Sequence, residues 1–214
     1  MSDGEGFDAQ AFQDRTGVSD ETLARYQVWL DLLSEVNAHT NLVGRSTLSE
    51  FWFRHALDSW QIFDLDPRAR RWADLGAGAG FPGMALAFGV MAQEGPVGQI
   101  YCVESIAKKA AFLRRVSRET QAPMTVIHDR VEALSDIPDV DIVTARAMAP
   151  LDKLLNYVKP FVDKGAYALL PKGARYESEL TEARKSWTFD LEVIHSQTAP
   201  DARILKIKGL ARVK

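Results

Sequence analysis

Apolar residues follow a helical period in the first third of the chain. Over residues 20–38 they recur every three to four positions, which predicts an amphipathic helix. Thr47-Leu-Ser-Glu50 has the sequence of a capping box, so we expect a second helix from there to about Phe63. Asp66-Pro67-Arg68 then breaks the pattern. The spacing therefore predicts an N-terminal helical extension over residues 1–67.

From residue 68 onward, short apolar runs alternate with amphipathic segments. Strands are predicted near 70–75, 99–104, 123–128, 139–145, 165–170, 188–195 and 202–209. Helices are predicted near 82–92, 107–120, 150–160 and 176–186. Such alternation is typical of a mostly parallel sheet with helices on both faces. We therefore expect residues 68–214 to form one α/β domain with seven strands, whose ligands bind beyond the carboxyl ends of the strands.

Composition narrows the class of protein. The 214 residues are 46% apolar, enough for a buried core. The single cysteine, Cys102, falls inside a predicted strand, so no disulfide framework is possible and a reducing compartment is expected. The first residues are acidic and polar, unlike a signal peptide, and no apolar run approaches the roughly 20 residues of a membrane span. We expect a cytoplasmic protein without a membrane segment.

Charge is divided unevenly along the chain. The formal net charge is −3, and residues 1–67 hold 12 acidic residues against 4 Lys or Arg, a balance of −8 that leaves +5 for the remainder. This argues against a general nucleic-acid coat but permits local contact between the basic part and RNA phosphates. In the helix over 107–120, Lys108, Lys109 and Arg115 either make such contacts or form a solvated face.

Residues 72–83 carry the strongest chemical signal. Asp74 follows an apolar stretch, and glycines stand at 76, 78, 80 and 83. Glycine permits the sharp turn and the close backbone approach to a ligand that a strand-to-helix loop requires. Pro82 suits the first turn of the helix that follows, where free N–H groups attract anionic or electron-rich groups. The segment therefore predicts a nucleotide-type ligand loop.

The glycine spacing selects among nucleotides. A dinucleotide fingerprint requires a glycine where Phe81 stands. The spacing Asp-x-Gly-x-Gly-x-Gly instead fits the first motif of S-adenosylmethionine-dependent methyltransferases. Glu104 ends the next predicted strand, and a carboxylate there can accept hydrogen bonds from both ribose hydroxyls. The alternative is a glycine-rich turn without a ligand, beside a solvated Glu104.

Further motifs extend this pattern over most of the chain. They are Asn41-Leu42, Arg54-His55-Ala-Leu-Asp58-Ser59, the loop 74–83, Lys108-Lys-Ala-Ala-Phe-Leu113, Arg130-Val-Glu132, Arg146-Ala147 and Lys172-Gly173. In this order they resemble the RsmG (GidB) family, bacterial methyltransferases that act on a guanine N7 of 16S ribosomal RNA. Three departures are small: Thr144-Ala145 where serine is usual, Glu104 where aspartate is common, and Pro171 before Lys172.

The resemblance implies a Rossmann-like class I methyltransferase fold with S-adenosyl-L-methionine as cofactor. With the glycine motif it assigns the cofactor site to Asp74, Gly76, Gly78, Gly80, Phe81, Glu104, Val131, Glu132 and Arg146. Two of these have structural alternatives: Phe81 could belong to the core, and Glu132 could cap a helix or pair with Arg130.

No residue is expected to act as a catalytic base, because guanine N7 carries a lone pair with no proton to remove and orientation suffices. Arg146 and Lys172 are candidates for orienting the substrate. Arg54 and His55 are candidates for RNA contact at the mouth of the pocket. The alternative for that segment is a structural network in which Asp58 pairs with Arg54, one helical turn away.

The expected partner is 16S ribosomal RNA or the small ribosomal subunit, bound by a monomer. No metal is expected, because one cysteine and four histidines form no cluster with metal-ligand spacing. Two other functions stay open: a methyltransferase with another substrate, and a non-catalytic nucleotide-binding regulator.

Overall fold

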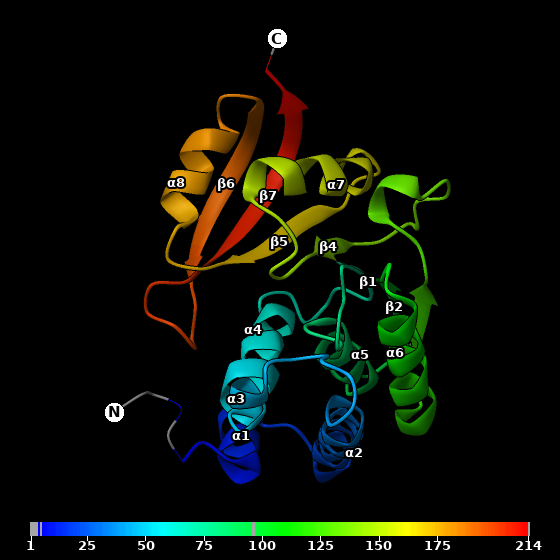
Figure 1. The fold of residues 1–214 in the computed structure, drawn as a ribbon. Coiled ribbons are helices and arrows are strands. Elements are labelled where there is room, and N and C mark those ends of the chain that lie inside the picture. Colours follow the sequence, from blue (N-terminus) through cyan, green and yellow to red (C-terminus); the bar gives the residue numbers. More distant parts are fainter. Residues whose placement is uncertain (1–3, 5, 96, 214) are drawn as a thin grey trace.

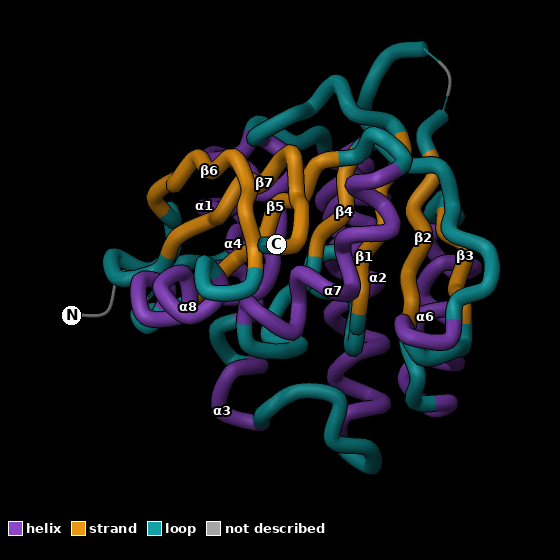
Figure 2. Tube along the Cα trace, turned by 90° about the horizontal axis from the view of Figure 1, so that it is seen from above, coloured by secondary structure: helices purple, strands orange, loops and turns teal. Residues whose placement is uncertain are grey.

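The computed structural model describes residues 4, 6–95 and 97–213. Its centre is a seven-stranded sheet in the order β3-β2-β1-β4-β5-β7-β6 (Figures 1 and 2). The strands are β1 Arg71–Leu75, β2 Gln99–Val103, β3 Met124–Ile127, β4 Ile142–Thr144, β5 Tyr167–Lys172, β6 Trp187–His195 and β7 Arg203–Arg212. Strands β1 to β5 are parallel, and β7 runs antiparallel to both β5 and β6. The predicted mostly parallel α/β sheet is confirmed.

Helices cover both faces of the sheet (Figure 1). They are α1 Ala9–Thr16, α2 Asp20–Asn37, α3 Arg45–Leu48, the π-helix η1 Phe51–Leu57, α4 Asp58–Asp64, α5 Gly83–Met91, α6 Ala107–Thr120, the 3₁₀ turn η2 Val131–Ala133, α7 Leu151–Asp163 and α8 Tyr176–Ala183. One core cluster packs α1, α2 and α4 to α6 against the sheet, and a second packs α7 and α8 against the other face. The N-terminal helices thus share a core with the sheet.

Two N-terminal predictions are wrong in detail. The expected capping box does not form, because Thr47 lies inside the short α3, where its hydroxyl donates to the Gly44 carbonyl. The expected single helix to Phe63 is instead α3, η1 and α4 in succession. Helix α1 was not predicted. It begins at Asp8, whose carboxylate accepts from the Ala11 N–H at 2.9 Å, and its only buried side chain is Phe12, so it offers no apolar period.

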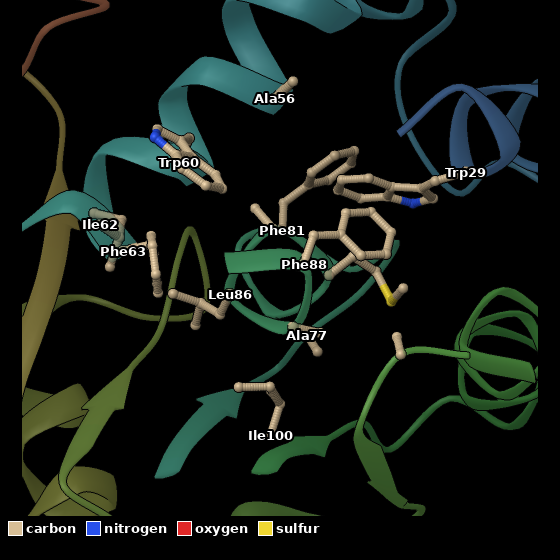
Figure 3. Packing of buried hydrophobic residues seen from close by; sticks show 14 of the residues in the cluster. Trp29, Ala56, Trp60, Ile62, Phe63, Ala77, Phe81, Leu86, Phe88 and Ile100 are labelled. Atoms are coloured by element: carbon tan, nitrogen blue, oxygen red, sulfur yellow. The ribbon is translucent and has the colours of Figure 1, made fainter. Parts of the chain in front are cut away.

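Aromatic rings join the N-terminal helices to the glycine loop. Figure 3 shows the Trp29 ring of α2 beside Phe81, with Phe88 of α5 next to both. The Trp29 indole N–H donates to the Ala79 carbonyl of the loop at 3.0 Å. Trp29 and Phe88 are fully buried. The N-terminal helices therefore fix the loop directly rather than only covering the sheet.

Candidate functional site

The glycine loop leaves β1 at the carboxyl edge of the sheet and turns across β2. The N–H groups of Gly76 and Ala77 both donate to the Val103 carbonyl, at 2.8 and 3.1 Å. Gly76, Gly78 and Gly80 have φ values of 70°, 60° and 102°, which a side chain would strain. A Cβ built on Gly78 meets only the Gly76 carbonyl oxygen, at 3.8 Å. The loop thus has open space above Gly78 that suits a close ligand.

Asp74 lies behind this loop. Its side chain is fully buried, and Oδ2 accepts from the Gly83 N–H at 2.8 Å. Burial raises the pKa of Asp74 to about 7, although the Gly83 bond and the charge of Arg146 oppose that rise. Among the described residues Oδ1 has no hydrogen-bond partner. Asp74 therefore holds the start of α5 against the sheet, and a direct cofactor contact stays a prediction.

Glu104 braces the loop from the end of β2. Its Oε2 accepts from the Gly78 N–H at 2.9 Å, and Oε1 accepts from the Ile106 N–H at 2.7 Å. The residue is only 5% exposed, so the alternative of a solvated Glu104 is wrong. Each carboxylate oxygen has two lone pairs. The group can therefore hold the loop and still accept hydrogen bonds from a ligand.

A cavity of about 200 Å³ brings together Gly76, Val131 and Glu132, as the family resemblance predicts. Glu132 Oε1 accepts from the Tyr157 hydroxyl of α7 at 2.6 Å. That hydrogen bond, more than any nearby charge, lowers the pKa of Glu132. Ser105, which follows Glu104, lines the same cavity. Residues from three strand ends thus meet beside the glycine loop.

Phe81 belongs to the aromatic core. It is 6% exposed and lies between the Trp29 ring, at 4.6 Å, and the His55 ring, which stacks on it at 4.4 Å. The Arg146 guanidinium lies 5.0 Å from the centre of the Phe81 ring. This supports the core alternative for Phe81. Its predicted contact with the cofactor stays a prediction.

Arg146, which follows β4, binds the N-terminal helices. Its Nη1 donates to Asp58 Oδ2 at 2.7 Å and to the Arg54 carbonyl at 3.3 Å. Its Nη2 lies 3.2 Å from His55 Nδ1. The expected pair between Asp58 and Arg54 is wrong, because the Arg54 side chain pairs with Glu50 at 3.1 Å instead. The predicted segment and Arg146 therefore meet, with different partners from those expected.

His55 is buried, with 8% of its surface exposed. Burial and the neighbouring Arg146 lower its pKa to about 4, so the ring is neutral at physiological pH. In this conformation it is covered by protein and does not face solvent as an RNA contact would. The Arg54 side chain is more than half exposed. Of the two predicted RNA contacts, only Arg54 has an accessible charge.

A second cavity, of about 520 Å³, lies beyond the ends of β4 and β5. Arg146, Lys172, Arg175 and Arg203 line it. Sequence reasoning did not find Arg175 and Arg203, because the return of β7 beside β5 places Arg203 opposite Lys172 and no local pattern shows this. The Arg146–Ala149 segment borders this cavity, and its residues Met148 and Ala149 also line the smaller one. The two cavities therefore share a wall.

Lys172 is committed to protein partners. Its ammonium donates to the Ala149 carbonyl and to Glu179 Oε2, both at 2.8 Å, and its side chain is 8% exposed. Pro171 pairs with Ile204 within the sheet, so it does not interrupt β5. Lys172 thus fixes the segment between β4 and α7. Its predicted role in orienting the substrate stays a prediction.

The basic helix α6 divides into two parts. Arg115 forms a two-point ion pair with Glu35 of α2, at 2.8 and 2.9 Å, and a third bond with Glu119. It therefore docks α6 on α2, which leaves little of its charge for RNA. Lys108 is exposed and Lys109 half-buried, and neither has an ion-pair partner within the described ranges. These two lysines remain candidates for phosphate contact.

Among the described residues, no group of three or more His, Cys, Asp or Glu side chains could hold a metal ion. No described helix is both long enough and apolar enough to cross a membrane.

The chain is similar to known proteins in sequence and in fold. The family model described as rRNA small subunit methyltransferase G matches residues 22–204. The protein "Ribosomal RNA small subunit methyltransferase G" of Caulobacter vibrioides is 45% identical, over 97% of this chain and 94% of that one. Its namesake in Bradyrhizobium diazoefficiens is 48% identical over 91% and 75%. The S-adenosylhomocysteine-bound methyltransferase PaMTH1 of Podospora anserina shares the fold, with a TM-score of 0.61 at 15% identity over 94% and 92% of the two chains. The chain belongs to the rRNA small subunit methyltransferase G family.

Proposed function

We propose that the protein transfers a methyl group from S-adenosyl-L-methionine to N7 of a guanine in 16S ribosomal RNA. The observation that carries the proposal is the pair of cavities that share the wall formed by Met148 and Ala149. One lies beside the glycine loop, and the other is lined by four cationic side chains. Family membership supports an RNA substrate, and the resemblance of the motifs supports the guanine N7.

We place the cofactor at the smaller cavity, beside Glu104, whose neighbours Val103 and Ser105 line it. Glu104 keeps free lone pairs for the ribose hydroxyls while it holds the Gly78 and Ile106 N–H groups. Val131 and Glu132 line the space into which an adenine would extend, and Gly76 admits the amino-acid part. Asp74 supports the loop from behind. When bound, the cofactor supplies an electrophilic methyl group.

The chain supplies orientation and no base. Guanine N7 has an in-plane lone pair and no proton, so a side chain that accepts a proton is not required. Alignment of two bound reactants accounts for much of the acceleration of such a step. The partly buried side chains of Arg146 and Lys172, near the shared wall, suit this role because each is held by at least two protein partners.

The larger cavity fits an RNA segment whose target base is unstacked, because the deep, narrow groove of an RNA duplex hides N7. Arg175 and Arg203 line its wall and bring charge for the flanking phosphates. Residues 1–67 complete the site as well as covering the sheet, since Asp58 lines this cavity and bonds Arg146. The N-terminal extension is therefore part of the working enzyme.

The test is methyl transfer from tritiated S-adenosylmethionine to small ribosomal subunits, and separately to naked 16S RNA, from a strain that lacks the gene. We expect label in one substrate, and 7-methylguanosine on mass spectrometry of the digested nucleosides. Label on another atom or on protein would refute the N7 assignment. Binding of S-adenosylhomocysteine without any transfer would favour a nucleotide-binding regulator instead.

A further inference from the structure

The guanidinium of Arg146 is held on one side by a single N-terminal segment. Asp58 Oδ2, the Arg54 carbonyl and His55 Nδ1 take three of its hydrogen bonds. The Phe81 ring covers it at 5.0 Å. All three partners lie 88 to 92 positions away along the chain. A contact set of this kind fixes the rotation of a planar group as well as its position.

A guanidinium carries five N–H groups, so two remain. Over the part of the chain that the structure describes, the Nε–H and the second Nη2–H of Arg146 have no hydrogen-bond partner. The nitrogens Nε and Nη2 share one edge of the guanidinium, the arrangement that binds both oxygens of a carboxylate or phosphate. Arg146 lines the 520 Å³ cavity.

We propose that His55 and Asp58 are positioning residues, which turn the Nε–Nη2 edge of Arg146 toward the cavity to bind an anion with two oxygens. The anion is either the carboxylate of the methyl donor or a phosphate of the RNA. The proposal rests on the proposed function only for the identity of these ligands.

The chemistry of His55 fits this role. Because Arg146 can only donate, Nδ1 of His55 must accept, and the ring proton then lies on Nε2. The groups that face the ring are Arg146, Arg54, Asp58 and the stacked Phe81. Burial lowers the pKa of the ring most, and two cations against one carboxylate act in the same direction, so the ring stays neutral. The ring is therefore an acceptor for Arg146 and carries no positive charge, and its Nε2–H has no partner among the described residues.

Asp58 extends the arrangement to another wall of the cavity. Its Oδ1 accepts from the Thr198 hydroxyl at 2.6 Å and from the Gln61 amide at 2.9 Å. Thr198 lies in the loop between β6 and β7. One carboxylate thus fixes both Arg146 and this loop, so a change at His55 isolates the effect on Arg146 better than a change at Asp58.

Two substitutions separate the functions of the His55 ring. His55→Phe keeps a ring on Phe81 and removes the acceptor, whereas His55→Asn keeps an acceptor oxygen and removes the ring. Arg146→Gln and the double variant His55→Phe/Arg146→Gln complete a double-mutant cycle. Arg25→Gln is the matched control, because Arg25 bonds the Thr120 carbonyl and docks α2 on α6 without touching Arg146.

The full chain is titrated with S-adenosylhomocysteine by calorimetry and with 16S RNA by filter binding. We expect Arg146→Gln to weaken one ligand by about tenfold or more, and His55→Phe to weaken the same ligand by about fivefold. The double variant should bind within twofold of Arg146→Gln, and His55→Asn should recover most of the loss. The control should bind as the unaltered protein does.

The ligand that responds identifies the anion: S-adenosylhomocysteine for the carboxylate, RNA for a phosphate. Three results would each overturn the proposal: losses of affinity that add in the double variant, an Arg146→Gln variant with unchanged affinity, or a His55→Phe variant that binds as the control does. Because the readout is binding, a failure to find 7-methylguanosine would refute the proposed reaction and leave this cycle intact.

Discussion

Replacement of Glu104 by glutamine tests the cofactor site most directly. The carboxylate receives two N–H groups, from Gly78 at 2.9 Å and from Ile106 at 2.7 Å. Glutamine has one oxygen and one NH₂ group, so it can accept only one of these, and its NH₂ group then faces the other donor. Either the loop or the start of α6 loses its anchor, and the charge that ribose hydroxyls would use is lost with it.

The magnitude follows from the number of charged hydrogen bonds lost. One bond to a charged group contributes about 1.5–3 kcal/mol, and each 1.4 kcal/mol is about tenfold in affinity. We therefore expect Glu104→Gln to bind S-adenosylhomocysteine about tenfold to a hundredfold more weakly in calorimetry. The N–H group left unpaired in a buried place should also lower the free energy of unfolding by about 1–3 kcal/mol.

Glu192→Gln is the matched control, because Glu192 is exposed and, among the residues that the structure describes, forms an ion pair only with Lys206, on the far strands. Circular dichroism and urea denaturation of both variants establish how much folded protein is titrated. A folded Glu104→Gln whose affinity changes by less than twofold would refute the reasoning. In that case the carboxylate serves only to hold the loop.

Three further predictions concern charged residues other than Glu104. Asp74→Asn should flatten the pH dependence of stability. The pKa of Asp74 is about 7 in the folded protein and 3.8 ordinarily, so the free energy of unfolding falls as the pH rises from 3.8 to 7. Urea denaturation of both proteins at pH 5 and pH 8 measures the difference. Replacing Lys108 and Lys109 with glutamine should reduce the slope of the logarithm of the RNA-binding constant against the logarithm of the salt concentration, by about 0.7–0.9 per lost phosphate contact. An unchanged slope would mean that the two lysines belong to a solvated face. Arg115→Gln should leave that slope unchanged and only slightly lower the urea concentration at the midpoint of unfolding, because its partner is Glu35 and exposed ion pairs contribute little to stability.

The sheet and the glycine loop could be predicted because their signals are local. Most strand boundaries lie within about two residues of the apolar runs. The exceptions are β4, expected over 139–145 and observed as Ile142–Thr144, and the end of β7, expected at 209 and observed at Arg212. The Asp141 carboxylate accepts from the Arg70 and Arg71 N–H groups, both at 2.9 Å. Just before β4, side-chain hydrogen bonds thus accompany the backbone bond from the Asp141 N–H to the Arg71 carbonyl, and apolar spacing cannot show this.

The partners of charged residues could not be predicted, because they depend on how distant helices pack. Helical spacing offered Arg54 two carboxylates, at Glu50 and Asp58, each four positions away. The structure pairs Arg54 with Glu50 and gives Asp58 to Arg146. An acid on the N-terminal side of the base is the better orientation, so sequence spacing slightly favours Glu50. It cannot show that Asp58 meets Arg146, which depends on the position of β4 beneath the N-terminal helices.

The π-helix η1 accounts for how one short segment can hold Arg146 through three groups. At its end, the Asp58 N–H bonds to the carbonyls of Phe53 and His55. In an α-helix the same N–H would bond to the carbonyl of Arg54. Here the Arg54 carbonyl accepts from Arg146. The capping box and regular helix that the sequence suggested would have engaged the Arg54 carbonyl within the helix. The wider π-helical turn instead directs this carbonyl, together with the side chains of His55 and Asp58, to the guanidinium of Arg146. This agrees with the frequent occurrence of π-helical turns at functional sites.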